Sequence, residues 1–132
     1  MATIFTRIVN GEIPAYKVAE TDRYLAFLDV FPLVKGHTLV IPKREVDYLF
    51  DLEEDEYTGL LLFAKKVSVG VRKAIPCKRV GVAVIGLEVP HAHIHLVPLN
   101  QMGDINFTNP KITLPADVMQ ETAAAISSHI TL

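Results

Sequence analysis

The sequence has a single cysteine, Cys77, among its 132 residues. One cysteine permits no intramolecular disulfide and no CxxC pair, which argues against a disulfide scaffold and against a structural zinc cluster built on cysteines. This sparse use of cysteine is typical of the reducing cytoplasm, where we expect the protein to reside. Because half of the residues are apolar, a chain of this length can form an ordinary hydrophobic core without such staples.

The sequence also lacks an excess of positive charge. Thirteen basic and fifteen acidic side chains give a net charge of -2. No overall positive field is therefore available to hold a long nucleic acid, whereas a small anionic ligand remains compatible with this balance. No apolar run reaches the length of a membrane span, and no basic segment followed by an extended apolar run stands at the start. We expect neither a nucleic-acid partner nor a membrane.

Internal repeats, low-complexity tracts and Gly/Ser linkers are missing too, so we interpret residues 1–132 as a single domain. Short apolar or β-branched runs bounded by turn residues predict the strands. These runs span residues 16–20, 24–28, 37–41, 80–85 and 91–97.

Helical periodicity is clearest between residues 53 and 74, where acidic side chains fill the first turn and basic ones lie near the end. The apolar positions of this segment are Leu60, Leu61, Phe63, Ala64, Val67 and Val71. Pro76 ends the helix, and residues 117–129 predict a second, C-terminal helix. Strands joined by short turns, with one long crossover helix, predict an α+β domain on an antiparallel sheet.

Three of the five histidines occupy alternate positions in His91-Ala92-His93-Ile94-His95. On an extended strand they share one face, with neighbouring Cα atoms about 6.6 Å apart. Ala92 and Ile94 take the other face, whose apolar character suits burial against a helix. We therefore expect the three imidazoles to line a cleft.

Three interpretations of the alternating histidines are possible. Each could be an ordinary hydrogen-bonded residue, neutral imidazoles could share a zinc ion, or one imidazole could act as a nucleophile. An imidazole with an unperturbed pKa near 6.5 is largely neutral at pH 7, so its lone pair is available without a separate base. In phosphoryl chemistry the middle residue, His93, is the natural nucleophile, with His91 and His95 on either side to hold oxygens. Spacing alone does not exclude the metal.

Several separated segments carry a family resemblance. The triad His91-Ala92-His93-Ile94-His95-Leu96-Val97, together with residues 4–14, 25–29 and 36–43 in the expected order and spacing, resembles the histidine triad (HIT) family. The resemblance covers roughly residues 4–98. It implies a single HIT-like domain with a five-stranded antiparallel sheet, one long helix and a C-terminal helix, and a variable tail from about residue 99. It also implies a two-fold homodimer.

The resemblance further implies hydrolysis or transfer on a nucleoside monophosphate conjugate, either a phosphoramidate or a dinucleoside polyphosphate, with no cofactor. His93 would carry a nucleotidyl-histidine intermediate, His91, His95 and His37 would complete the phosphate site, and Asp29 would accept hydrogen bonds from the ribose. The base pocket, for a purine such as that of AMP, would consist of Phe5, Ile8, Ile13, Phe27, Leu28 and Val30. A nucleotide-binding regulatory module with little turnover is the alternative.

Three departures from the family pattern matter, and one of them is the tail beyond Pro98, which matches no specific relative although the resemblance implies that this region approaches the active site. The loop before the triad is short, and Glu88 occupies a place where relatives often have amide or hydroxyl donors. We hypothesise that Glu88 lies at the substrate and assists the leaving group. Thr3 and Thr6 stand where many bacterial relatives carry a cysteine pair for structural zinc, and Glu45 stands where these often have histidine. The loss of these ligand types predicts a chain without structural zinc.

Overall fold

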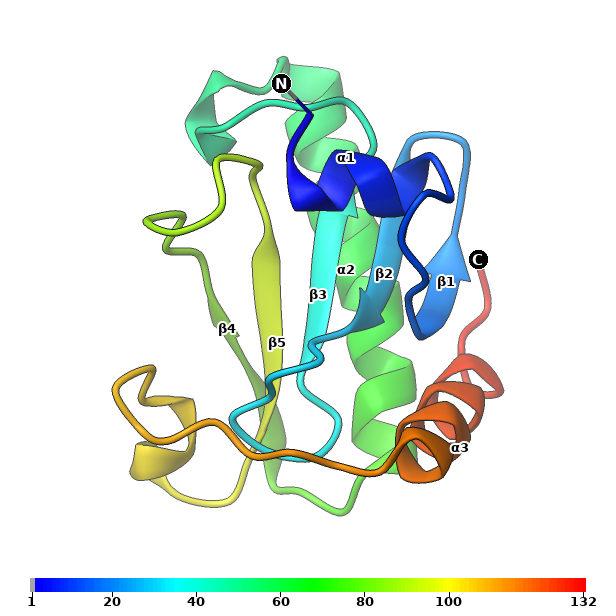
Figure 1. The fold of residues 1–132 in the computed structure, drawn as a ribbon, viewed down its shortest axis with the longest axis vertical. Helices are drawn as coiled ribbons and strands as arrows, with labels where there is room; N and C mark the ends of the chain where they lie inside the picture. Colours follow the sequence, from blue (N-terminus) through cyan, green and yellow to red (C-terminus); the bar gives the residue numbers. More distant parts are fainter. Residues whose placement is uncertain (1) are drawn as a thin grey trace.

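A five-stranded antiparallel sheet separates two layers of helices (Figure 1). The computed structural model describes residues 2–132. Its elements are α1 (Ile4–Val9), β1 (Lys17–Glu20), β2 (Tyr24–Leu28), β3 (Thr38–Pro42), α2 (Glu54–Ala74), β4 (Arg79–Ala83), β5 (Ile94–Leu99) and α3 (Ala116–Ser127), with short 3-10 helices at Leu49–Asp51 and Met102–Ile105. The strand order is β1-β2-β3-β5-β4, and every pairing is antiparallel. The predicted α+β fold is confirmed.

Each face of the sheet has its own apolar core, because successive side chains of a strand point to opposite faces. On the face covered by α2 and α3, Ala26, Val40 and Ile94 pack with residues of both helices. On the other face, Leu25 and Phe27 pack under α1 (Figure 1). The sheet is thus covered by apolar side chains on both faces near its centre.

The long helix α2 begins one residue later than predicted and ends at the predicted residue. Five of its six predicted core positions are buried, namely Leu60, Phe63, Ala64, Val67 and Val71. Burying a side chain of this kind contributes roughly 1.5–3 kcal/mol. Leu61 is 40% exposed, so its assignment to the apolar face was wrong. It follows Leu60 by one helical step of about 100°, which carries it off the buried stripe.

The predicted strand over residues 91–97 is wrong at its start, because β5 begins at Ile94. The β3–β5 ladder ends where Val40 faces Ile94. Continuing that register would bring the chain before Ile94 opposite Pro42, which has no N–H to donate. The backbone N–H of His91 instead donates to Val89 at 2.8 Å, and that of Ala92 donates to Val46 at 2.7 Å. The first two histidines therefore lie in a turn that leads into the strand.

The N-terminal segment forms the short helix α1, which the sequence analysis did not predict. The Thr3 hydroxyl caps it by accepting a hydrogen bond from the Thr6 backbone N–H at 3.1 Å. Phe5 and Ile8, three residues apart, face the sheet. The turn follows at Gly11, whose φ of 78° suits glycine.

The remaining predicted elements differ from the structure only at their ends. The predicted strands at 16–20, 37–41 and 80–85 are β1, β3 and β4, and the C-terminal helix runs over Ala116–Ser127 instead of residues 117–129. Across residues 2–132, none of the helices combines the length and the apolarity needed to cross a bilayer.

Candidate active site

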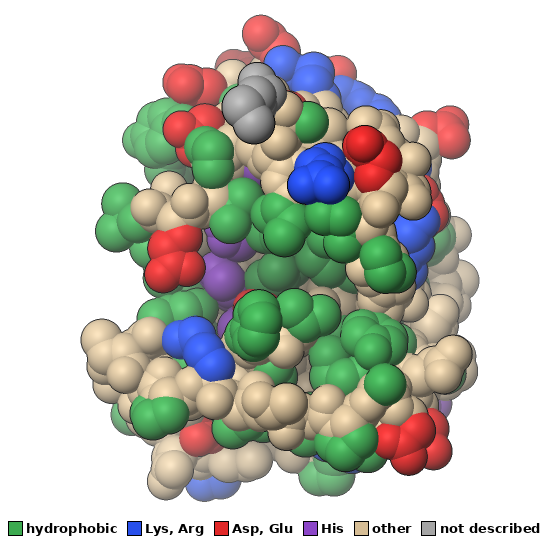
Figure 2. Space-filling model, in the orientation of Figure 1, with side chains coloured by type: hydrophobic (Ala, Val, Ile, Leu, Met, Phe, Trp, Pro, Cys, Tyr) green, Lys and Arg blue, Asp and Glu red, His purple; other side chains and the backbone are tan. Residues whose placement is uncertain are grey.

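Histidine side chains form the floor of a hollow on the face of the sheet that carries α1 (Figure 2). His93 and His95 keep 7% and 8% of their surface exposed, whereas His91 and His37 keep 0% and 1%. The rings of His93 and His95 lie 4.8 Å apart, centroid to centroid. The structure thus brings these two predicted catalytic residues together at the point where a ligand in the hollow could reach them.

The position of His93 determines which of its nitrogens is free. Its Nδ1 lies 2.8 Å from the backbone carbonyl oxygen of His91, so Nδ1 carries the proton and donates it. The lone pair of a neutral His93 ring is then on Nε2. Phe5 packs its ring against that of His93 in an edge-to-face contact with a centroid distance of 5.0 Å, which restricts the imidazole orientation.

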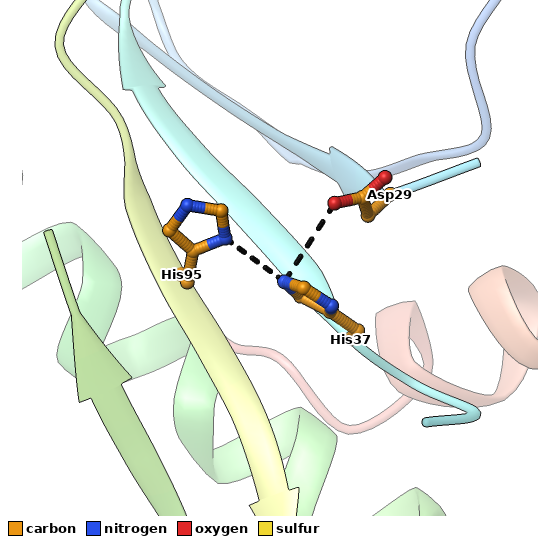
Figure 3. Close-up of side chains that lie close together, drawn as sticks. All are labelled: Asp29, His37 and His95. Carbon is orange, nitrogen blue, oxygen red and sulfur yellow. Dashed lines mark hydrogen bonds and ion pairs between the residues drawn. The ribbon is translucent and has the colours of Figure 1, made fainter. Parts of the chain in front are cut away.

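His37 and His95 form a buried hydrogen-bonded pair (Figure 3). The backbone N–H of Leu33 donates to Nδ1 of His37 at 3.0 Å, so the neutral ring carries its proton on Nε2. That proton is donated to Nδ1 of His95 at 2.9 Å, which leaves the proton of His95 on Nε2. Burial lowers the pKa of His37 to about 4 and that of His95 to about 3, so both rings are neutral at pH 7.

Asp29 follows β2 and lies beside this pair. One carboxylate oxygen is 3.7 Å from Nε2 of His37, and the other accepts a hydrogen bond from the Phe31 backbone at 2.9 Å. Burial raises the pKa of Asp29. Potential ligand atoms of Asp29, His37 and His95 lie within 4.8 Å of one another, a spacing at which nitrogen and oxygen ligands can share a metal ion (Figure 3).

His91 occupies a different environment from the other triad members. Its Nε2–H donates to the carbonyl oxygen of Pro42 at 2.8 Å, and the Thr3 hydroxyl lies 2.9 Å from its Nδ1. Burial lowers the pKa of His91, which keeps the ring neutral. Both ring nitrogens are thus engaged by the protein. The contact between this residue and His93 runs through the His91 backbone carbonyl.

Thr3, Thr6 and Glu45 extend the contacts of His91 to the surface. Glu45 accepts hydrogen bonds from the Thr3 backbone N–H at 2.8 Å and from the Thr6 hydroxyl at 2.6 Å. The Thr3 N–H bond contributes most to a lowered pKa of Glu45. The three positions at which the sequence departs from zinc-binding relatives therefore meet at His91 and form hydrogen bonds.

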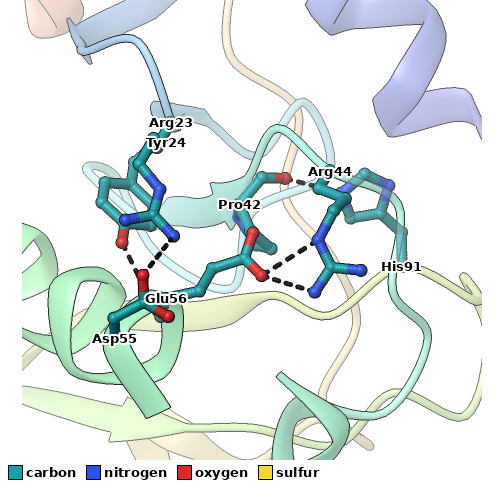
Figure 4. A network of polar contacts seen from close by, with 7 residues as sticks. All are labelled: Arg23, Tyr24, Pro42, Arg44, Asp55, Glu56 and His91. Carbon is teal, nitrogen blue, oxygen red and sulfur yellow. Dashed lines mark hydrogen bonds and ion pairs between the residues drawn. The ribbon is translucent and has the colours of Figure 1, made fainter. Parts of the chain in front are cut away.

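A second polar network lies near Pro42, whose backbone carbonyl oxygen accepts from His91 (Figure 4). Nε and Nη2 of Arg44 both donate to one oxygen of the buried Glu56 carboxylate, at 3.0 and 2.6 Å. The Tyr24 hydroxyl donates to the Glu56 carbonyl oxygen at 3.0 Å. The start of α2 is thereby tied to β2 and to the segment that follows β3, which fixes the frame around His91.

Not all of the apolar residues predicted for a base pocket meet. Phe5 and Ile8 of α1 pack against Phe27 of β2, with 5.6 Å between the two phenyl centroids, and Ile13 packs against their edge. Leu28 lies in the core on the opposite face, because it follows Phe27 by one step of the strand. Val30 is 52% exposed in the loop after β2.

Three charged or aromatic residues complete the surroundings of the histidines. Glu88 is exposed in the loop before the triad, and its charge acts on Asp29. The sequence analysis did not identify Phe107 or Lys111. Phe107 packs edge-on against His95, with 4.6 Å between the centroids, and the Lys111 amine lies 5.6 Å from the Phe107 ring centroid. No local pattern marks them, since they reach the site only through the path of the C-terminal segment.

Known proteins match this chain over nearly its full length. A HIT-like protein of Borreliella burgdorferi is 34% identical and aligns over 96% of this chain and 97% of its own. The adenosine 5'-monophosphoramidase hnt1 of Schizosaccharomyces pombe is 34% identical over 98% of this chain and 99% of its own. A crystal structure of a Hit-like protein from Bartonella henselae, described as involved in cell-cycle regulation, superposes with a TM-score of 0.85 at 28% identity, covering 97% of this chain and 96% of that one.

The family model described as the HIT domain matches residues 10–102, which include all five strands and the three alternating histidines. The chain therefore belongs to the histidine triad (HIT) family.

Proposed function

We propose that the protein hydrolyses a nucleoside monophosphate conjugate, a phosphoramidate or a dinucleoside polyphosphate, through a nucleotidyl intermediate on His93. The observation that carries this proposal is the hydrogen bond from Nδ1 of His93 to the His91 carbonyl oxygen at 2.8 Å. Because this bond keeps the proton on Nδ1, the lone pair of Nε2 is available to attack phosphorus without a separate base. The name of the fission yeast relative, an adenosine 5'-monophosphoramidase, supports the same class of substrate.

The reaction has two steps. Nε2 of His93 attacks the α-phosphorus, a bond between phosphorus and nitrogen forms, and the bond to the leaving group breaks with its electron pair on that group. The leaving group takes up a proton from solvent, and the second step returns one to solvent. Water then attacks the same phosphorus, the bond to Nε2 breaks, and a proton is released with the nucleoside monophosphate. Nε2–H of His95 is available to donate a hydrogen bond to a phosphate oxygen in both steps.

The remaining residues have binding roles in this proposal. Asp29 accepts hydrogen bonds from the ribose hydroxyls, and Phe5, Ile8 and Phe27, with Ile13 at their edge, contact a purine base. His37 holds His95 in its tautomer. His91 positions His93 through the carbonyl oxygen and contributes no free ring nitrogen, since both are bonded within the protein.

The experiment is incubation with an adenosine phosphoramidate and with diadenosine tetraphosphate, followed by quantification of AMP. Wild type should release AMP, and His93→Ala should lose at least about a thousandfold in rate, as is usual when a nucleophile is removed. Acid-quenched single turnovers with labelled substrate should trap label on wild type only. His129→Ala, which alters an exposed histidine after the end of α3, is the control. Nucleotide binding without AMP release would leave the chain as a regulatory binding module.

The convergence of Asp29, His37 and His95 favours a second candidate, a metal-dependent hydrolase. In that case their three ligand atoms would hold a zinc ion that activates water. Activity that persists after exhaustive chelation, with no zinc found by elemental analysis, would eliminate this candidate. Activity that is lost and then restored by Zn²⁺ would favour it over nucleophilic catalysis by His93.

We infer in addition that two copies pair through β4 as a homodimer. β4 is an edge strand, and its Val82 is 62% exposed, which is costly for an unpaired edge. Light scattering coupled to gel filtration should give the mass of a dimer for wild type. Val82→Lys should shift it to the mass of a monomer, whereas Val69→Lys on the exposed side of α2 tests whether any added charge has that effect.

A further inference from the structure

The segment between β5 and α3 lies against the His37–His95 pair. It leaves the 3-10 helix at Met102–Ile105 and crosses the lower end of the sheet on its way to α3 (orange in Figure 1). The Ile112 backbone N–H donates to the Pro32 carbonyl oxygen at 2.9 Å, which attaches the segment to the loop after β2. The Phe107 ring packs edge-on against His95 at 4.6 Å and against His37 at 6.1 Å.

This segment also carries a cation to the same place. The exposed Lys111 donates from Nζ to the Phe107 carbonyl oxygen at 2.9 Å, and Nζ lies 5.6 Å from the centroid of the Phe107 ring. Its charge acts on Asp29, His37 and His95 alike. The Lys111 ammonium therefore lies close to the Phe107 ring, which itself packs against His95, at the solvent-exposed edge of the site.

A cation is valuable at this place because the buried His37–His95 pair supplies little positive charge. His37 and His95 are neutral at pH 7, since burial lowers the pKa of both. The nearby carboxylates of Asp29 and Glu88 are negative when ionised, and they oppose an anionic substrate. Transfer of a phosphoryl group is favoured by cations around its oxygens. Among these groups, Lys111 alone brings a permanent positive charge.

We propose that Lys111 is a specificity-determining residue that binds the phosphate chain of the substrate beyond the α-phosphate. It thereby favours conjugates whose leaving group carries phosphate over conjugates whose leaving group is a neutral amine. This inference rests on the proposed function. The rings of His93 and His95 lie 4.8 Å apart, so an α-phosphate on His93 would lie beside the Nε2–H of His95, whereas Lys111 contacts the Phe107 ring that packs against His95. In this proposal, the phosphate beyond the α-phosphate lies nearer to the exposed edge of the site. The flexible side chain of Lys111 can contact it there.

The first test compares kcat/KM for diadenosine tetraphosphate and for an adenosine phosphoramidate with a neutral amine leaving group. Lys111→Met should lower the value for the tetraphosphate about tenfold, as expected for the loss of a charged hydrogen bond, and by much less for the phosphoramidate. Lys111→Arg should retain most of the preference. Lys66→Met, which removes a lysine from the exposed side of α2, controls for net charge. An unchanged ratio of the two substrates in Lys111→Met would overturn the proposal.

A second measurement separates this proposal from the proposed hydrolysis. In a His93→Ala background, calorimetry gives the dissociation constants of AMP and ATP with and without Lys111→Met. Adding the lysine change should weaken ATP binding about tenfold relative to AMP binding, and raised salt should reduce the difference. If wild type hydrolyses neither substrate, the proposed function fails, and this ratio still decides the role of Lys111. Equal losses for AMP and ATP would refute it.

Discussion

The Thr3 hydroxyl lies 2.9 Å from Nδ1 of His91, although 88 positions separate the two residues in the sequence. The same hydroxyl caps α1 by accepting from the Thr6 backbone N–H. Thr3 thus connects helix α1 to His91, the first histidine of the triad. Formation of α1 and the orientation of His91 are therefore coupled through one oxygen atom.

Replacement of this oxygen should affect both stability and catalysis. We expect Thr3→Ala to lower the free energy of unfolding by about 1–2 kcal/mol, the usual cost of a lost helix cap, and to lower kcat more than it raises KM. Thr3→Ser keeps the hydroxyl and should behave almost as wild type. Urea unfolding and steady-state kinetics check both parts. A loss no larger than that of Thr58→Ala, at an exposed position of α2, would contradict the dual role.

The buried histidines predict how stability depends on pH. The pKa of His37 is about 4 in the folded chain and 6.5 in the absence of burial. Between these values the unfolded chain binds more protons, so stability falls as pH decreases from 6.5 towards 4, by up to about 1.4 kcal/mol per pH unit for this residue. His95 adds to the effect, since burial lowers its pKa to about 3.

Denaturant unfolding at pH 7, 6 and 5 checks this expectation. His37→Asn removes one of the two groups and should make the decline with falling pH shallower, even if the variant is less stable at pH 7. His129→Asn, at an exposed position after α3, serves as the control and should leave the slope unchanged. Equal slopes for wild type and His37→Asn would show that His37 does not resist protonation in the folded protein.

Gly70 lies where α2 and α3 meet. A Cβ at this position would lie 2.6 Å from the Ile126 carbonyl oxygen and 2.5 Å from Cγ1 of Ile130. Alanine usually favours a helix by about 1 kcal/mol over glycine, but overpacking of a tight contact costs about 1–3 kcal/mol. We expect Gly70→Ala to lower the melting temperature, whereas Ser68→Ala should not. A Gly70→Ala protein that is more stable than wild type would contradict the close approach of α2 and α3 at Gly70.

The role of Glu88 towards the leaving group can be tested by substitution. If its carboxylate assists departure of the leaving group, Glu88→Gln should lower the rate on the phosphoramidate and change its ratio to the rate on diadenosine tetraphosphate. The substitution removes the charge and preserves the size of the side chain. Glu121→Gln, on the exposed side of α3, is the matched control. Unchanged rates on both substrates would eliminate this role for Glu88.

Local patterns predicted the elements of the fold well. The spacing of Leu60, Phe63 and Val67 follows the helical period, and short apolar runs bounded by turns correspond to the five strands. These signals succeed because helix and strand periodicity are properties of consecutive residues. The start of β5 was missed because it depends on Pro42, a residue of the neighbouring strand that cannot donate to the ladder.

The candidate site was only partly predictable. Alternation placed Ile94 and Leu96 in the core under the helices and His93 and His95 on the opposite face. It could not determine what each ring would contact. The family pattern placed Leu28 beside Phe27 in one pocket, whereas the pleat of β2 separates them to the two faces.

The sequence by itself determined the secondary-structure elements, the family and the residue types that can carry the chemistry, because these depend on the spacing of residues along one chain. Only the tertiary structure decided which nitrogens of His93 and His95 are free and which nitrogens of His37 and His91 are bonded within the protein. Hydrogen bonds from Leu33 to His37, from His37 to His95, and from His93 to the His91 carbonyl assign the protons. The approach of Lys111 and Phe107 is likewise a tertiary property, because it arises from the path of a segment that has no periodic pattern.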